Sequence, residues 1–148
     1  MGMCVEESVN EWFDSLPGTG GIYRLIDEAR DTVRQRERVG AVIALGESND
    51  PRAVRALMEC CNDGDAGIRR HAIEGLGKLR SGRAVQVLIE RLNDKGEHPA
   101  TRERVIAALA AIRSYGAISG LKDRYSDAGE DPAIRSSIGQ VLSMMRIR

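Results

Sequence analysis

Four leucines recur along the chain at intervals of 31, 33 and 33 residues, and each has an arginine seven residues before it. The leucines are Leu45, Leu76, Leu109 and Leu142, and the arginines are Arg38, Arg69, Arg102 and Arg135. A repeat of about 20 to 50 residues is typical of proteins in which each unit buries its apolar face against the next unit. This register therefore predicts a stack of similar units rather than a fold built around one central core.

The residues around each of these register leucines predict a helix. Apolar residues stand four residues before all four leucines and three residues before three of them, namely Ala41, Ala72, Val105 and Ile138, then Val42, Ile73 and Ile106. Spacings of three and four residues define one face of a helix. The residue after each leucine is small, as in Gly46 and Gly77, which would let a neighbouring helix approach closely. We call these predicted helices the A helices.

A second leucine follows the first by 12 residues in three repeats and predicts a second set, the B helices. Their apolar positions are Val54, Leu57 and Cys61, then Val85, Leu88 and Leu92, then Ile118, Leu121 and Tyr125. The connections from A to B are short and contain Asp50-Pro51, Ser81-Gly82 or Tyr115-Gly116. Asp50 is a good N-cap residue because a proline follows it at the first helical position. Connections this short predict antiparallel helical hairpins.

The same frame extends towards both ends of the chain. Leu25 lies 32 residues before Leu57 and marks another B helix, while residues 5–16, with Trp12 and Phe13, fit a divergent first A helix. We therefore expect an all-α protein of about nine helices in one domain, residues 1–148. It would consist of an N-terminal cap repeat (5–31), three full repeats (34–63, 66–94 and 99–127) and a C-terminal capping helix (132–147).

The register arginines call for acidic partners. Each lies in the first turn of a predicted A helix, where a cation opposes the helix dipole. An aspartate stands six to eight residues before each arginine, and these are Asp31, Asp63, Asp94 and Asp127. The simplest interpretation is a ladder of Asp–Arg pairs that sets the angle between repeats. Unpaired arginines in contact with solvent are the alternative.

Several of these features together resemble HEAT repeats. They are the Leu-Gly pair near the end of the A helix, the Asp-Pro or Ser-Gly turn, and an aspartate followed by Ile-Arg, and the resemblance covers residues 20–148. The short period is similar to that of the phycobilin-lyase type of HEAT-like repeat. The resemblance implies a right-handed α-solenoid, a superhelix of helical hairpins, whose B helices line a concave surface that binds a partner.

One alignment of polar positions predicts a binding surface on the B helices. Two residues after each B-helix leucine stands a carboxylate, and these are Asp27, Glu59, Glu90 and Asp123. Other polar side chains share their helix face, so the predicted partner-binding residues are Tyr23, Asp27, Arg52, Arg55, Glu59, Arg83, Gln86, Glu90, Ser119 and Asp123. This surface fits a protein or peptide with a basic or mixed-charge surface. The alternative is a solvated face on which Arg55 and Glu59 simply pair with each other.

Composition and residue types argue against other functions. Lys and Arg number 22, as do Asp and Glu, and a net charge of zero argues against nucleic-acid and anionic-membrane binding. Deoxyhypusine hydroxylases with HEAT-like repeats imply a di-iron site built from several His-Glu pairs, but this chain has only His71 and His98. We expect no catalytic, cofactor-binding or metal-binding residues, and hence a non-catalytic protein–protein interaction scaffold. The alternative is an accessory or regulatory subunit of an enzyme complex, and phycobilin-lyase-like activity is much less favoured.

The cysteines and the C-terminal helix complete the expectations. The three cysteines lack the spacing of a disulfide framework or a zinc site, and the N-terminal residues do not fit a signal peptide, which together favour the cytoplasm. Cys61 should lie in the core and Cys60 at its margin, where a redox-sensing role is a hypothesis. The last helix ends in Met144, Met145 and Ile147 without a following B helix, so we also consider a homodimer through this helix.

Overall fold

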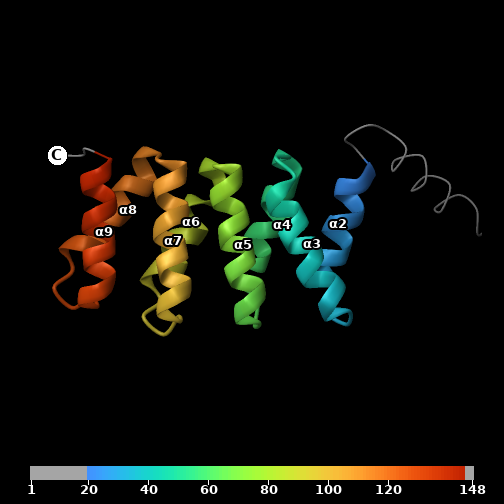
Figure 1. Ribbon diagram of the computed structural model, residues 1–148, viewed down its shortest axis with the longest axis horizontal. Coiled ribbons are helices and arrows are strands. Elements are labelled where there is room, and N and C mark those ends of the chain that lie inside the picture. The colour runs from blue at the N-terminus through green and yellow to red at the C-terminus, as the bar shows by residue number, and fades with distance from the viewer. Residues whose placement is uncertain (1–19, 146–148) are drawn as a thin grey trace, which may run out of the picture.

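The computed structural model describes residues 20–145, which form a row of eight α-helices without strands (Figure 1). The helices are α2 (Gly20–Arg30), α3 (Gln35–Glu47), α4 (Val54–Cys60), α5 (Ala66–Leu79), α6 (Val85–Asn93), α7 (Pro99–Ile112), α8 (Tyr115–Ser126) and α9 (Pro132–Met144). Short 3-10 helices, Pro51–Ala53 and Gly82–Ala84, lead directly into α4 and α6. The predicted helix at residues 5–16 lies outside the described residues, as do the last residues of the predicted C-terminal helix.

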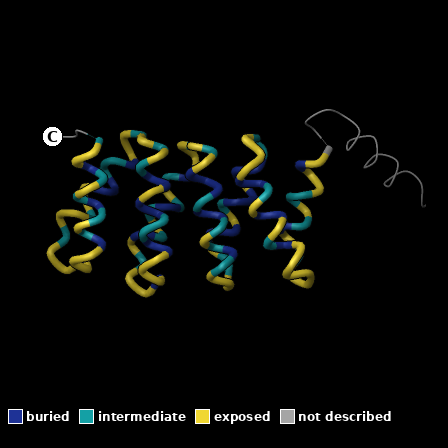
Figure 2. The backbone as a smooth tube through the Cα atoms, in the orientation of Figure 1, coloured by how far each residue is buried: buried dark blue, intermediate teal, exposed yellow. Residues whose placement is uncertain are grey.

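The helices form two layers, and the core lies between them. The A helices α3, α5, α7 and α9 each pack on the next A helix, and the B helices α2, α4, α6 and α8 each pack on the A helix that follows. The register leucines of the A helices and Leu57, Leu88 and Leu121 of the B helices are all buried between the layers (Figure 2). The prediction of an all-α solenoid is confirmed.

Small residues set the distance between neighbouring A helices. A Cβ added to Gly46 of α3 would lie 2.6 Å from the Cα of Gly75 in α5. A Cβ added to Gly77 of α5 would lie 3.0 Å from the Cα of Ala108 in α7. The backbones therefore meet almost directly, which explains why glycine follows the register leucine despite its poor helix propensity.

The ends of the helices follow local rules that the sequence displays. Asp50 accepts a hydrogen bond from the Arg52 amide at 2.9 Å, as its predicted N-cap role requires, and Asp65 and Asp131 cap α5 and α9 in the same way. After the A helices, Asn49, Arg80 and Arg113 have φ values of 52°, 51° and 53°. Each stands four residues after a register leucine, so the left-handed turn is part of the repeat.

Two predictions about the core of the B helices are wrong. Cys60 is buried rather than marginal, because α2 covers it and its Sγ lies 4.0 Å from the carbonyl oxygen of Ala29. Burial raises the pKa of both adjacent thiols, that of Cys61 to about 12, so neither has the low pKa and exposure of a redox-sensing cysteine. Tyr125 is 45% exposed rather than buried, because its ring extends to the surface beneath the guanidinium of Arg135.

Candidate functional site

Each register arginine is the fourth residue of its A helix and reaches back to the preceding B helix or the loop after it. Arg38 Nε donates to the carbonyl oxygen of Ala29 at 2.9 Å, and Arg102 Nε donates to that of Leu92 at 3.0 Å. Arg69 and Arg135 donate to carbonyl oxygens in the same way, to those of Asp63 at 2.7 Å and Tyr125 at 3.1 Å. A cation is favourable at the carbonyl end of a helix. These contacts therefore offset the unfavourable position of the arginine in its own helix.

The acidic partners of these arginines lie in the loop after the following B helix, and not in the preceding loop that holds the predicted aspartate, so the predicted pairs are wrong. Arg38 pairs with Asp63, Arg69 with Glu97 at 2.8 Å, and Arg102 with Glu130 at 2.8 Å. Arg135 has no carboxylate partner within residues 20–145, and its guanidinium lies 5.8 Å from the centre of the Tyr125 ring.

The four predicted aspartates share a different role, because each accepts a hydrogen bond from a backbone N–H two residues later. The pairs are Asp31 with Val33 at 2.9 Å, Asp63 with Asp65 at 2.8 Å, Asp94 with Gly96 at 2.9 Å, and Asp127 with Gly129 at 2.9 Å. They form the turn that leads from each B helix to the next A helix. Of these four aspartates, only Asp63 also forms an ion pair with a register arginine, Arg38. The loop from Asp63 to the next register arginine is two residues shorter than the loops that follow Asp94 and Asp127. In those two longer loops the carboxylates that pair with the register arginines are Glu97 and Glu130.

The carboxylates of these pairs become increasingly buried along the chain, with 18%, 2% and 0% of their side chains exposed. The side chains of Arg102 and Glu130 are 4% and 0% exposed, and a second arginine, Arg124, lies 3.3 Å from the same carboxylate. Hydrogen bonds from Arg38, Arg69 and Arg102 hold the pKa values of Asp63, Glu97 and Glu130 below their usual range. These carboxylates are therefore ionised at neutral pH. Their geometry indicates a structural role, which is to join each repeat to the next.

The ten predicted partner-binding residues, which we call the B face, lie on the solvent side of the B helices. Eight of them are exposed, and Arg52 and Ser119 are half-buried. Several are held by other side chains: Arg52 pairs with Asp50 at 2.6 Å and lies 5.3 Å from the centre of the Tyr23 ring. Glu59 pairs with Arg30 at 3.0 Å and lies 3.9 Å from Arg55. The acidic row is thus partly neutralised by arginines, and the B face is a mixed-charge surface.

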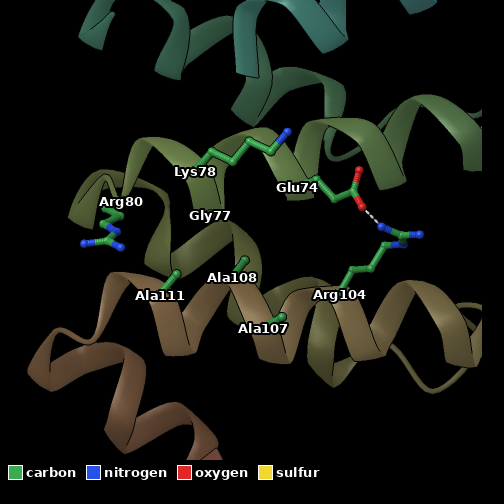
Figure 3. A pocket seen from close by; sticks show the side chains of 8 residues that line it. All are labelled: Glu74, Gly77, Lys78, Arg80, Arg104, Ala107, Ala108 and Ala111. Atoms are coloured by element: carbon green, nitrogen blue, oxygen red, sulfur yellow. Dashed lines mark ion pairs between the residues drawn. The ribbon is translucent and has the colours of Figure 1, made fainter. Parts of the chain in front are cut away.

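A groove between two A helices was not predicted from the sequence. It has a volume of about 530 Å³, lies between α5 and α7 in the layer of A helices, and is lined by Glu74, Gly77, Lys78, Arg80, Arg104, Ala107, Ala108 and Ala111 (Figure 3). We call it the A groove. One signal in the repeat frame could have revealed it, because α7 has Ala107 and Ala111 at the positions where α5 has Glu74 and Lys78. Exposed alanines leave a hollow where longer side chains would fill it.

Comparisons with known proteins agree with this architecture. Residues 22–98 match the sequence profile of the family described as HEAT repeats. The chain belongs to the HEAT-repeat family. No curated protein sequence matches this HEAT-repeat chain significantly.

Two solved structures resemble the HEAT-repeat chain. Human deoxyhypusine hydroxylase in complex with glycerol is similar over 86% of this chain, with a TM-score of 0.74 and 28% sequence identity. The match covers 44% of that hydroxylase, so this chain spans less than half of its length. An engineered protein is similar over 93% of this chain and 40% of its own, with a TM-score of 0.56 and 16% identity, which shows a shared fold alone.

The two histidines of this HEAT-repeat chain do not fit a metal centre built from His-Glu pairs. His71 Nδ1 lies 3.8 Å from Glu74, but that carboxylate also pairs with Arg104. His98 Nδ1 accepts a hydrogen bond from the Ala100 amide as an N-cap, and Glu97 beside it is held by Arg69. Within residues 20–145 no three His, Cys, Asp or Glu side chains gather as ligands of one ion.

Two further findings concern the predicted location and the predicted homodimer. No helix in residues 20–145 combines the length and the apolar character needed to cross a membrane. Met144 at the end of α9 is 82% exposed, and Ile147 lies outside the described residues. A homodimer through this helix stays a prediction.

Proposed function

We propose that this HEAT-repeat protein is a non-catalytic interaction scaffold whose B face binds a protein or peptide with a basic or mixed-charge surface. The observation that carries the proposal is the position of Asp27, Glu59, Glu90 and Asp123. All four are exposed, and all stand at one repeat position on four successive B helices. Such a row can match cations repeated along a partner, and complementary charge gives both orientation and specificity.

The arginines of the B face give it a second kind of contact. Arg55 and Arg83 are exposed beside the acidic row. Arg52 is fixed between Asp50 and the ring of Tyr23, so its side chain needs little ordering when a partner binds. Arginine and tyrosine are over-represented among residues that dominate binding energy. A partner that carries both acidic and basic residues would therefore satisfy this surface better than a purely basic one.

Reversal of two charges tests the proposal. The double variant Glu59→Lys/Glu90→Lys should lose a partner that the tagged wild-type chain captures, because two repulsive contacts replace two attractive ones. The measurement is quantitative mass spectrometry of the captured proteins. The control is Glu37→Lys, which reverses a charge at an exposed position of α3 that belongs to neither the B face nor the A groove. Equal recovery of every partner by the wild type and the B-face variant would refute the proposal.

A second candidate is an accessory subunit of an enzyme complex, and the similarity to a human hydroxylase favours it. In that case the captured partner would itself be an enzyme and would supply the active residues. The activity of the purified partner, measured with and without this chain, separates the two candidates. A partner whose activity is the same in both conditions favours the scaffold.

A further inference from the structure

We propose that the A groove binds an acidic helical segment of a partner protein, at a site separate from the B face. The groove runs between α5 and α7, and its lining residues belong to the A helices and to the turn that follows α5 (Figure 3). Its volume of about 530 Å³ lies within the usual range of binding sites. The A groove therefore lies in the other layer of the solenoid from the B face. Its proposed ligand is acidic, whereas the proposed partner of the B face is basic or mixed in charge.

The charges of the groove favour an acidic ligand. Three cations, Lys78, Arg80 and Arg104, line it together with one carboxylate, Glu74. Glu74 is already paired with Arg104 across the groove, so its charge is neutralised (Figure 3). Lys78 lies 3.7 Å from Glu47, and Arg80 has no ion pair within residues 20–145. Arg80 is therefore the cation of the lining that is left to pair with a carboxylate of a ligand, and its guanidinium can bind both carboxylate oxygens.

The floor of the groove favours a helix. Gly77 and Ala108 bring α5 and α7 into backbone contact, and the exposed Ala107 and Ala111 continue a surface of small side chains. A helix laid on such a surface can place its apolar side against the alanines and its acidic side chains on the cations at the rim. The shallow alanine floor leaves room for the partner's longer apolar side chains.

The left-handed backbone of Arg80 belongs to the repeat and explains where its side chain lies. This residue ends α5 with φ of 51°, in the left-handed region where glycine is usual and a long side chain is strained. The left-handed backbone begins the turn after α5, and the side chain lines the groove.

The same lining argues against a nucleic acid. No aromatic side chain lines the groove, so bases would have no ring to stack on. The whole chain has no net charge, whereas strong binding to a phosphate backbone normally requires a basic excess. A short acidic peptide needs only the few cations that the groove provides.

A labelled peptide tests the proposal directly. The probe is a fluorescent helical peptide of about 18 residues with glutamates on one face and leucine and alanine on the other. Its binding is followed by fluorescence anisotropy at about 50 mM salt, where exposed charges are weakly screened. We expect saturable binding to the wild-type chain and none of a peptide in which lysine replaces every glutamate. Equal binding of both peptides would overturn the proposal.

Two variants separate loss of the site from loss of the fold. Arg80→Gly removes the free cation and also relieves the left-handed strain, so its Tm should be unchanged or higher while binding weakens at least about fivefold. Arg113→Gly is the matched control, since Arg113 has the same backbone conformation but does not line the groove. It should bind within about twofold of the wild type.

A filled groove gives a further test. Ala107→Trp places a large side chain on the exposed floor and should weaken binding at least about tenfold while helicity is kept. The B-face variant Glu59→Lys/Glu90→Lys should bind the peptide as tightly as the wild type does. The test of the A groove is therefore independent of the test of the proposed function. If both Arg80→Gly and Ala107→Trp bind the acidic peptide with wild-type affinity, binding in the A groove is refuted. Equally tight binding of a single-stranded oligothymidylate, weakened by the same variants, would refute the choice of an acidic peptide.

Discussion

At the scale of single residues, the register arginine is used for contacts that lysine could not reproduce. Arg102 donates to the carbonyl oxygen of Leu92 through Nε and Nη2, and to both oxygens of Glu130 through Nη1 and Nη2. One planar guanidinium therefore binds the end of one B helix and the carboxylate in the loop after the following B helix at the same time. A lysine offers a single point charge at this place. The recurrence of arginine in four repeats thus has a geometric reason.

The buried position of Glu130 makes it a sensitive test of this arrangement. Glu130→Gln should lower the free energy of unfolding by about 3 kcal/mol or more, because Arg102 stays buried without a compensating charge. Urea denaturation at neutral pH measures the change.

Glu59→Gln is the matched control for this variant. Glu59 also pairs with an arginine of a neighbouring repeat, Arg30, but the two side chains are 49% and 48% exposed. Its loss should cost less than about 1 kcal/mol. Equal effects of the two variants would show that burial does not decide the strength of these pairs.

At the scale of helices, contacts between glycines determine how closely the A layer packs. Gly46 and Gly75 face each other across α3 and α5, and each occupies the space that a Cβ of the other would need. Gly40 lies on the same α3 helix, but a Cβ added there would meet no atom within 4 Å. The two glycines of one helix should therefore respond in opposite ways to the same substitution.

We expect Gly46→Ala to destabilise the protein by about 1 to 3 kcal/mol, because α3 and α5 must move apart to admit the methyl group. Gly40→Ala should instead stabilise it by about 0.5 to 1 kcal/mol, as alanine normally does in an open helix position. The midpoints of urea denaturation of both variants check the pair of predictions. A stabilising effect of Gly46→Ala would contradict the close contact between the helices.

The same contacts show what a sequence can predict at this scale. The register leucines, the small residues beside them and the division into A and B helices follow from local periodicity, and the structure confirms them. The partners of the arginines did not follow from the sequence, because each lies 25 or 28 residues further along the chain and is brought close only by the packing of the helices. Two extra residues in the loops after Asp94 and Asp127 also shift the carboxylate to Glu97 and Glu130. The A groove was missed because exposed alanines in one helix become a hollow only when the neighbouring helix is placed beside them.

At the scale of the whole molecule, the arginine pairs connect the described repeats into one network. Arg38, Arg69 and Arg102 each bind a carboxylate in the loop that leads to the next A helix, so three successive junctions depend on ionised acids. In a repeat protein the interfaces between neighbours supply much of the stability. Protonation of these acids should therefore weaken the whole stack rather than one local element.

The unfolding free energy should accordingly fall as the solution becomes acidic. The arginines lower the pKa values of Asp63, Glu97 and Glu130 in the folded chain, so the unfolded chain binds more protons once the pH drops to the usual carboxyl range, about 4. Each such carboxyl contributes a slope of up to about 1.4 kcal/mol per pH unit between its unfolded and folded pKa. Stability should be nearly constant from about pH 7 to 8 and decline below about pH 5. Urea denaturation across this range measures the profile.

The Glu130→Gln variant tests whether the junctions cause this decline. It lacks one of the three carboxyls, so its profile should be shallower, and its stability difference from the wild type should shrink as Glu130 becomes protonated in the wild type. His71 also has a lowered pKa, chiefly because burial disfavours its charged form, and it adds a weaker decline that begins nearer pH 6.5. His71→Gln should remove this upper part and leave the steeper acid decline intact. A constant difference between Glu130→Gln and the wild type down to the lowest pH would mean that the network does not hold the repeats together.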